Sequence, residues 1–260
     1  MSETLLVMED LCIRSPSRTL VEGVNIEVQA GRVTAVVGHS GSGKSLSARA
    51  CMAVLDVDPG LVRGSLRYPA ASPADLFEGV RGGGMRAQKA LLRRTKKYRG
   101  GYITYSPQSA SSALNPGRTI GAQLAIAVAR RENPPKSASH MATIIRDVLE
   151  EVGLPPRASG ALPGELSGGM AQRAALAIAI APQPRIMIAD EPETGLDPVL
   201  RRVVNELMLQ VAKDHGVGLM LISHNMDTVR RCADHVVRVG HDAPDPTLSD
   251  RPIKHREAQQ

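Results

Sequence analysis

A glycine- and serine-rich stretch of eight residues separates a strand-like run, 33–37, from a helix-like run, 46–55. Glycines let the backbone fold its N–H groups around an anion, and the start of the following helix adds positive potential. A lysine here can reach the outer phosphates of a nucleotide, and a serine hydroxyl can ligate Mg²⁺. The stretch is a complete G-x-x-x-x-G-K-[ST] phosphate loop made of Gly38, His39, Ser40, Gly41, Ser42, Gly43, Lys44 and Ser45. An ordinary turn before a helix is the simpler alternative, but the strand, loop and helix order favours a nucleoside triphosphate site.

Two adjacent carboxylates follow a second apolar run, 185–189. Asp190 stands where a Walker B aspartate would hold Mg²⁺, and Glu191 could polarise an attacking water. The same pair could instead be the acidic start of a helix. The phosphate loop upstream favours the catalytic interpretation.

A third motif, residues 166–173, begins a predicted helix that continues through an alanine-rich run to Ala181. Ser167 is expected to cap this helix, and Gly168 and Gly169 leave the neighbouring backbone N–H groups accessible. Together with the helix dipole, these groups make an anion site. In isolation the motif would indicate only the start of a helix.

Strand-like runs alternate with helical ones along the chain, at 33–37, 101–105, 185–189 and 218–223. Polar side chains follow the last three runs, and they are Gln108, Asp190 with Glu191, and His224. In an open α/β sheet, ligands bind outside the carboxyl ends of the parallel strands. We therefore predict an α/β fold in which these side chains converge beside the phosphate loop.

Between Gln108 and Glu165 the apolar periodicity becomes helical, with helices expected at 120–130 and 141–152 and proline-containing breaks around them. We interpret this part as a helical subdomain inserted into the α/β core. From about residue 241 the chain is polar and contains prolines, so a flexible tail is expected over 241–260.

The composition is that of a globular chain with one large or two small domains, since hydrophobic residues are 42% and charged residues 22% of the 260. Aromatic residues are only 2%, which argues against a protein that stacks single-stranded nucleic acid on aromatic rings. Three widely separated cysteines suggest a reducing compartment. The N-terminus lacks the features of a signal peptide, and no apolar run approaches the roughly 18 residues that would span a bilayer.

The formal net charge is +6, and a basic run at 81–99 contributes to it. A solvated surface helix is the favoured interpretation of this run. A nucleic-acid patch, a surface facing an anionic membrane and a site for an acidic partner are the alternatives. The sequence does not choose among them.

The phosphate loop, the Ser167 motif and Asp190 follow one another in an order that resembles the ABC ATPases, and the resemblance covers about residues 5–240. It implies a P-loop NTPase (ABC ATPase) core with a parallel-rich sheet. It also implies an inserted helical subdomain at approximately 109–165, within an ABC ATPase domain of residues 1–240. ATP and Mg²⁺ are the implied cofactors, and ATP hydrolysis is the implied activity.

The resemblance also assigns roles to single residues. Glu191 would act as general base or water orienter, and His224 would be the switch histidine at the γ-phosphate. Ser45, Gln108 and Asp190 would hold Mg²⁺. Gln108 would in addition couple the ATPase to a membrane subunit.

Two ATPase subunits, identical or homologous, are implied to close face to face. Ser167, Gly168 and Gly169 would then contact the γ-phosphate held by the opposite subunit. Asp197, in the D-loop at 195–197, would communicate across the dimer.

The segments 106–116 and 165–170 are similar to those of the ATPases that drive dipeptide, oligopeptide and nickel import. This similarity implies two transmembrane permease subunits, an extracytoplasmic substrate-binding protein that acts indirectly, and no nucleic-acid partner. It places the chain peripherally on the cytoplasmic face of the inner membrane. The alternative is a soluble ABC ATPase that acts on nucleic acid or in a metabolic enzyme complex.

Two features depart from the family pattern. No aromatic residue precedes Tyr68, so adenine is expected to rest on Arg14, Arg18 or an aliphatic side chain. Glu193 replaces a commoner threonine and adds a charge near the D-loop.

Overall fold

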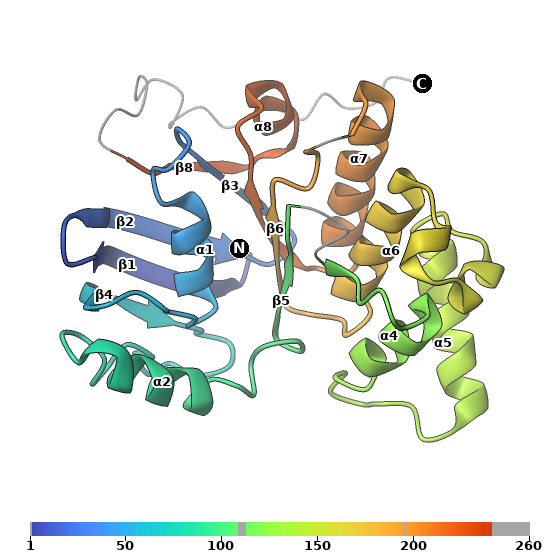
Figure 1. Ribbon diagram of the computed structural model, residues 1–260, viewed down its shortest axis with the longest axis horizontal. Helices are drawn as coiled ribbons and strands as arrows, with labels where there is room; N and C mark the ends of the chain where they lie inside the picture. Colours follow the sequence, from blue (N-terminus) through green and yellow to red (C-terminus); the bar gives the residue numbers. More distant parts are fainter. Residues whose placement is uncertain (1, 109–112, 195, 241–260) are drawn as a thin grey trace.

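The computed structural model describes residues 2–108, 113–194 and 196–240 and has two sheets flanked by helices (Figure 1). The first sheet is antiparallel, with strand order β2-β1-β4. Its strands are β1 (Thr4–Arg14), β2 (Thr19–Gln29) and β4 (Gly60–Arg67). Buried and exposed residues alternate along much of β2, as expected where one face of a sheet packs on a core.

The second sheet is parallel, with strand order β5-β6-β7-β3-β8. Its strands are β3 (Val33–Val37), β5 (Ile103–Ser106), β6 (Ile186–Asp190), β7 (Gly218–Ile222) and β8 (His235–Arg238). Every residue of β3, β6 and β7 is buried, which explains why these strands are almost entirely apolar in the sequence, with Thr34 and the terminal Asp190 as the polar exceptions. The four predicted strands are all present, with ends that differ by up to two residues from the expected ones.

The helix that follows the phosphate loop, α1 (Lys44–Cys51), begins and ends earlier than expected. The apolar run continues to Leu55, but Ala53 has a left-handed backbone with φ of 55°. The N–H of Val54 then bonds back to the carbonyl of Arg49, 2.9 Å away. The chain therefore leaves the helix at Met52, although its side chains remain apolar. The prediction of a helix to residue 55 was wrong.

Helices are inserted between β5 and β6, and their buried side chains belong to a hydrophobic cluster that also includes residues of β3, β6 and β7. The helices are α4 (Ile120–Val128), α5 (Ala138–Glu151), the short η1 (Pro156–Gly160) and η2 (Pro163–Glu165), and α6 (Gly168–Ile180). Leu124, Leu149 and Leu176 are among the buried side chains that join them. The predicted α/β class with inserted helices is confirmed. The boundaries proposed for the subdomain, 109–165, remain a prediction, and residues 109–112 lie outside the described residues.

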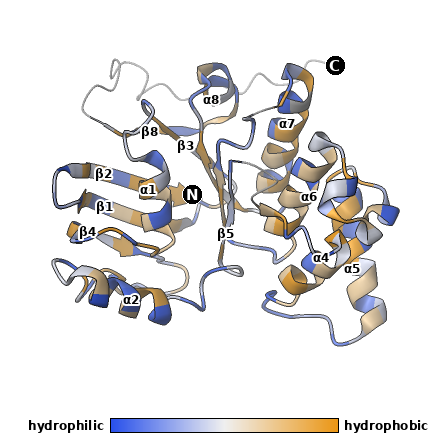
Figure 2. Cartoon of the chain, viewed as in Figure 1, coloured by the Kyte–Doolittle hydropathy of each residue, from blue (hydrophilic) through white to orange (hydrophobic). Residues whose placement is uncertain are grey.

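Three further helices, α2 (Gly84–Arg94), α7 (Pro198–Asp214) and α8 (Met226–Cys232), complete the described fold. The helix predicted in the basic run is α2, at the lower edge of Figure 1. Figure 2 shows apolar residues concentrated in the central strands and hydrophilic residues on the outer side of α2. Within the described residues, no helix combines the length and the hydrophobicity needed to cross a bilayer. The predicted tail, 241–260, lies outside the described residues.

Candidate functional site

The phosphate loop runs from the end of β3 to the start of α1 and passes close to β2. Gly43 has a backbone φ of 101°, a conformation that residues other than glycine rarely adopt. A Cβ atom there would lie 2.6 Å from Cγ2 of Val21 and 2.8 Å from the carbonyl oxygen of Leu20. Only glycine therefore fits at this position, and the loop is closed against β2.

Lys44 is 7% exposed, and its Nζ donates hydrogen bonds to the carbonyl oxygens of Gly38 at 2.9 Å and His39 at 3.0 Å. The ammonium group thus lies inside the curve of the loop. The buried hydroxyl of Ser42 has no hydrogen-bond partner, and the side chain of Ser45 is exposed. A buried cation, an unpaired hydroxyl and an accessible hydroxyl are groups that suit phosphate oxygens and a hydrated Mg²⁺.

A hollow of about 420 Å³ lies beside the loop. Its lining comes from three segments, residues 19–24, 39–42 and 238–240. Leu20, Val21 and Val24 give it an aliphatic side, while Arg14 and Arg18 are not part of the lining.

Asp190 ends β6 and is 6% exposed. The hydroxyl of Tyr105, on the neighbouring strand β5, donates to its Oδ2 at 2.8 Å. Burial raises the pKa of Tyr105, and the Asp190 carboxylate raises it further as hydrogen-bond acceptor and as nearby charge. The phenol therefore stays protonated and fixes one oxygen of Asp190. The sequence analysis did not identify Tyr105, because nothing in its own strand signals this contact.

Glu191 lies where the ends of three parallel strands meet. Its Oε2 accepts from Nε2 of Gln108 at 3.0 Å, beyond β5, and lies 3.3 Å from Nδ1 of His224, beyond β7. The hydroxyl of Thr194 donates to the same oxygen at 3.3 Å. The structure thus brings together three side chains that the sequence analysis selected from separate strands.

The backbone at Glu191 is strained, with φ of 45°. Its N–H donates to the carbonyl of Ile222 at 2.9 Å, which ties it to the end of β7. Residues in this conformation cost roughly 1–3 kcal/mol and persist where their surroundings hold them in place. The position of the carboxylate is therefore determined by the sheet as well as by its side-chain partners.

Ser167 caps α6 as expected, since its side chain accepts from the N–H of Met170 at 3.3 Å. Ser167 and Gly168 are exposed, and Gly169 is buried. None of these three residues lines the hollow beside the phosphate loop. The structure does not bring them into the site of their own chain, and α6 lies on the other side of β5 and β6 from α1 (Figure 1).

Asp197 immediately precedes α7, and its carboxylate accepts from the N–H of Val199 at 2.9 Å. It is exposed. Gly195, the first residue of the predicted D-loop, lies outside the described residues.

Comparison with known proteins agrees with this arrangement of motifs. Residues 21–194, more than half of the chain, match the family described as ABC transporter. The chain belongs to the ABC transporter family.

Two curated relatives of this ABC chain illustrate the similarity. It is 32% identical over 219 residues to the dipeptide transport ATP-binding protein DppD of Escherichia coli, covering 84% of this chain and 62% of that protein. It is 36% identical over 222 residues to the nickel import ATP-binding protein NikD of Rhodospirillum rubrum, covering 84% and 75%. The chain thus spans about three fifths of the length of the dipeptide relative.

Solved structures confirm the fold of the ABC chain. The dimeric structure of MJ0796, a bacterial ABC transporter cassette, superposes with a TM-score of 0.73 at 18% identity, covering 91% of this chain and 94% of the other. A dimeric post-hydrolysis state of the same cassette, bound to ADP and Pi, gives a TM-score of 0.72 at 19% identity, with the same two coverages.

Glu193 of this ABC chain is an additional feature whose environment the sequence did not indicate. It is 3% exposed, and its carboxylate accepts from Ser223 at 2.6 Å, Thr228 at 2.7 Å and Asn205 at 3.1 Å. Ser223 also accepts from the N–H of Asn225 at 3.0 Å. The charge expected near the D-loop is therefore buried in a network that joins the loop after β6 to the segment around His224.

Replacing Glu193 by alanine is expected to lower the free energy of unfolding by about 2–4 kcal/mol, because three buried donors lose their acceptor. Urea denaturation of the purified chain measures this. The matched control is Glu132→Ala, which removes an exposed carboxylate. If Glu193→Ala lowers the free energy of unfolding no more than Glu132→Ala does, the buried network does not contribute to stability as proposed.

Proposed function

We propose that this chain is the ATP-binding and ATP-hydrolysing subunit of a transporter and energises import through separate membrane permeases. The observation that carries this proposal is the shared contact of Gln108 and His224 with one oxygen of Glu191. This contact lies at the same edge of the parallel sheet as the phosphate loop. A positioned carboxylate next to a phosphate cradle supports water-dependent cleavage of a phosphoanhydride.

The triphosphate would lie in the loop of residues 38–45, with Lys44 turning from the loop carbonyls to the phosphates. Ser45, Gln108 and Asp190 would hold Mg²⁺, which supplies neutralisation of the charge that develops on the phosphate oxygens. Tyr105 restrains one oxygen of Asp190, so the other oxygen stays available for the ion or its water.

Glu191 would orient the attacking water and accept its proton. Nδ1 of His224 lies 3.3 Å from Oε2 of Glu191, so Nε2, on the other side of the ring, would be the atom that contacts the γ-phosphate. Adenine would rest on the aliphatic side of the hollow at Leu20 and Val24, because the arginines considered as stacking partners do not line it.

The second half of the site would come from another ABC ATPase subunit, identical or homologous. Ser167 and Gly168, at the capped start of α6, are exposed and do not line the hollow of their own chain. They can therefore be presented to a nucleotide held by a partner. The dimeric states of the MJ0796 cassette, one of them bound to ADP and Pi, support this arrangement.

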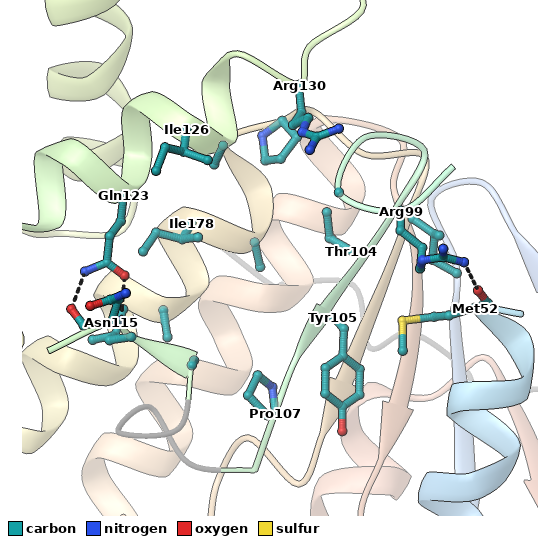
Figure 3. A pocket seen from close by; sticks show the side chains of 18 of the residues that line it. Met52, Arg99, Thr104, Tyr105, Pro107, Asn115, Gln123, Ile126, Arg130 and Ile178 are labelled. Atoms are coloured by element: carbon teal, nitrogen blue, oxygen red, sulfur yellow. Dashed lines mark hydrogen bonds between the residues drawn. The ribbon is translucent and has the colours of Figure 1, made fainter. Parts of the chain in front are cut away.

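A groove of about 580 Å³ between β5, α4 and α6 would receive a cytoplasmic segment of a permease (Figure 3). Its lining is largely apolar, and Ile126 in it is 50% exposed. Pro107 lies at one end of the groove and is followed in the chain by Gln108. A permease segment that contacts Pro107 would therefore be adjacent to the residue that donates to Glu191. The groove therefore offers a short mechanical connection between a permease and the catalytic edge.

The names of the relatives point to a peptide or to nickel as the cargo. An extracytoplasmic binding protein would deliver it to the two permeases, and the ATPase would lie peripherally on the cytoplasmic face of the inner membrane. Reconstitution of the chain with its permeases in vesicles, with ATP-dependent uptake of dipeptides and of nickel ions as two separate readouts, tests this assignment. A full transporter that moves neither cargo would overturn it.

The shared site predicts complementation between two inactive chains. Ser167→Arg obstructs the helix start, and Glu191→Gln removes the base, so each variant alone is expected to hydrolyse ATP poorly. A mixed dimer contains one intact site, made of Glu191 from the first variant and Ser167 from the second. Mixing equal amounts is expected to raise the hydrolysis rate at least about tenfold above either variant, if one base contributes 10²–10⁴-fold.

The rate of the unmodified chain per molecule should also rise with protein concentration until the dimer is saturated. Activity that is independent of dilution in a chain verified as monomeric by sedimentation would contradict the shared site. Failure to complement, where fluorescence energy transfer between differently labelled variants shows that mixed dimers form, would do the same.

A further inference from the structure

The charge of this chain is divided very unevenly along the sequence. From residue 79 to residue 131 there are eleven arginines and lysines and no aspartate or glutamate. This segment therefore carries a charge of +11, whereas the rest of the chain carries −5, because the total is +6. A cationic surface in an otherwise anionic protein indicates an acidic or phosphate-bearing partner.

Several of these cations have partners inside the protein. Arg81 pairs with Asp75, Arg94 donates to backbone carbonyls, and Arg131 donates to the carbonyl of Ala181. By contrast, the side chains of Arg86, Lys89, Arg93 and Lys96 form no hydrogen bond or ion pair within the part of the chain that the structure describes. All four are exposed and lie on α2 or just after it.

One side of α2 is fixed to the protein, and the other presents these cations. Gln88 and Leu91 are buried, and Nε2 of Gln88 donates to the carbonyls of Val57 at 2.7 Å and Pro59 at 3.1 Å. The helix therefore cannot turn its cations inward. Spacings of three and four residues place Arg86, Lys89 and Arg93 on the outer side, where they line one shallow hollow.

Two apolar side chains border the cations. Met85 is 37% exposed and Leu92 is 40% exposed, and their angular positions around α2 lie next to that of Lys89. We use the name α2 face for Met85, Arg86, Lys89, Leu92 and Arg93. A basic stripe beside exposed apolar side chains is typical of segments that lie at the boundary of lipid headgroups and acyl chains.

We propose that the α2 face binds the anionic headgroups of a phospholipid membrane. Each cation near such a surface adds roughly 1 kcal/mol of attraction, about fivefold in the partition coefficient. The exposed Met85 and Leu92 would enter the headgroup region. A lipid surface fits better than single-stranded nucleic acid, because no aromatic side chain for base stacking occurs on the α2 face.

The position of α2 agrees with this occupant. Arg99, Arg118 and Arg130, from the same acid-free segment, line the groove assigned above to the permease. Figure 1 shows α2 and α4 along the same lower side of the molecule. A chain docked to a permease through this groove would thus turn α2 toward the membrane. This argument from orientation rests on the proposed function, whereas the arguments from charge and exposure do not.

The test is co-sedimentation of the purified full-length chain with two kinds of vesicle, phosphatidylcholine alone and phosphatidylcholine with phosphatidylglycerol. Binding is expected only to the second kind and should weaken with added salt. The variant Arg86→Gln/Lys89→Gln/Arg93→Gln should lose on the order of a hundredfold in partition coefficient. Met85→Ser/Leu92→Ser should lose several-fold without changing the salt dependence.

The matched control is Lys136→Gln/Arg157→Gln/Lys213→Gln, which removes the same net charge from exposed positions outside the segment. Equal losses in the two triple variants would mean that only overall charge matters, and would overturn the proposal. Absence of binding to anionic vesicles would also overturn it. So would binding of duplex DNA that depends on the same three cations while vesicles are not bound.

ATP hydrolysis by the same variants with their permeases in detergent separates this inference from the proposed function. Loss of vesicle binding with unchanged permease-stimulated hydrolysis supports a lipid contact that is distinct from catalysis. If the unmodified chain binds anionic vesicles but is not stimulated by the permeases, the transport assignment fails and the lipid contact stands.

Discussion

Glu191→Gln is expected to lower the ATP turnover of this chain by about 10²–10⁴-fold, the contribution of a positioned general base. Glutamine has nearly the same shape, and its oxygen can still accept from Gln108 or Thr194. It cannot accept a proton from water, so the chemical step fails while the surrounding geometry is largely kept. Steady-state phosphate release, with nucleotide affinity measured separately, provides the comparison.

The affinity for ATP should change by no more than about threefold, because an interaction made only in the transition state lowers turnover without weakening ground-state binding. Glu150→Gln, on the exposed side of α5, is the matched control and should retain full turnover. Near-normal hydrolysis by Glu191→Gln would remove this carboxylate from the base role. A large loss of affinity would instead indicate that the variant distorts the nucleotide site.

Local sequence was sufficient for the elements that carry Glu191. The fully buried strands β3, β6 and β7 are mostly apolar runs followed by polar residues, so their existence was predictable. Convergence of Gln108 and His224 on Glu191 followed from one rule, that parallel strands direct their carboxyl ends to the same edge. The end of α1 was not predictable in this way, because its turn at Ala53 depends on backbone conformation and not on a change in hydrophobicity.

The features of the site that could not be predicted from the sequence depend on contacts between distant segments. Tyr105 and Asp190 are 85 residues apart, and Glu193 and Thr228 are 35 apart, so neither pair has a local signature. The basic run at 81–99 illustrates the same limit. Its composition could not distinguish Arg94, which is bonded to backbone carbonyls, from Arg93, which faces outward beside Lys89. Only the packing of Gln88 and Leu91 decides which cations remain accessible.

Lys44→Ala is expected to weaken ATP binding by about 10–100-fold, since a hydrogen bond to a charged group contributes roughly 1.5–3 kcal/mol. The ammonium group is already inside the loop, held by the carbonyls of Gly38 and His39, so it needs only a short movement to reach a phosphate. Titration with a fluorescent ATP analogue measures the affinity. Lys136→Ala, which removes an exposed lysine far along the chain, is the matched control.

Loss of the two loop hydrogen bonds could by itself lower the stability of the Lys44→Ala chain, and a thermal measurement separates the two effects. A ligand raises the free energy of unfolding by RT ln(1 + [L]/Kd), so at a fixed ATP concentration the gain in stability reports affinity. Whatever the nucleotide-free midpoint of Lys44→Ala, the increase in its midpoint on adding ATP should be much smaller than the increase in Lys136→Ala. An unchanged increase would show that the loop binds its ligand without this lysine, and the phosphate-loop assignment would then be wrong.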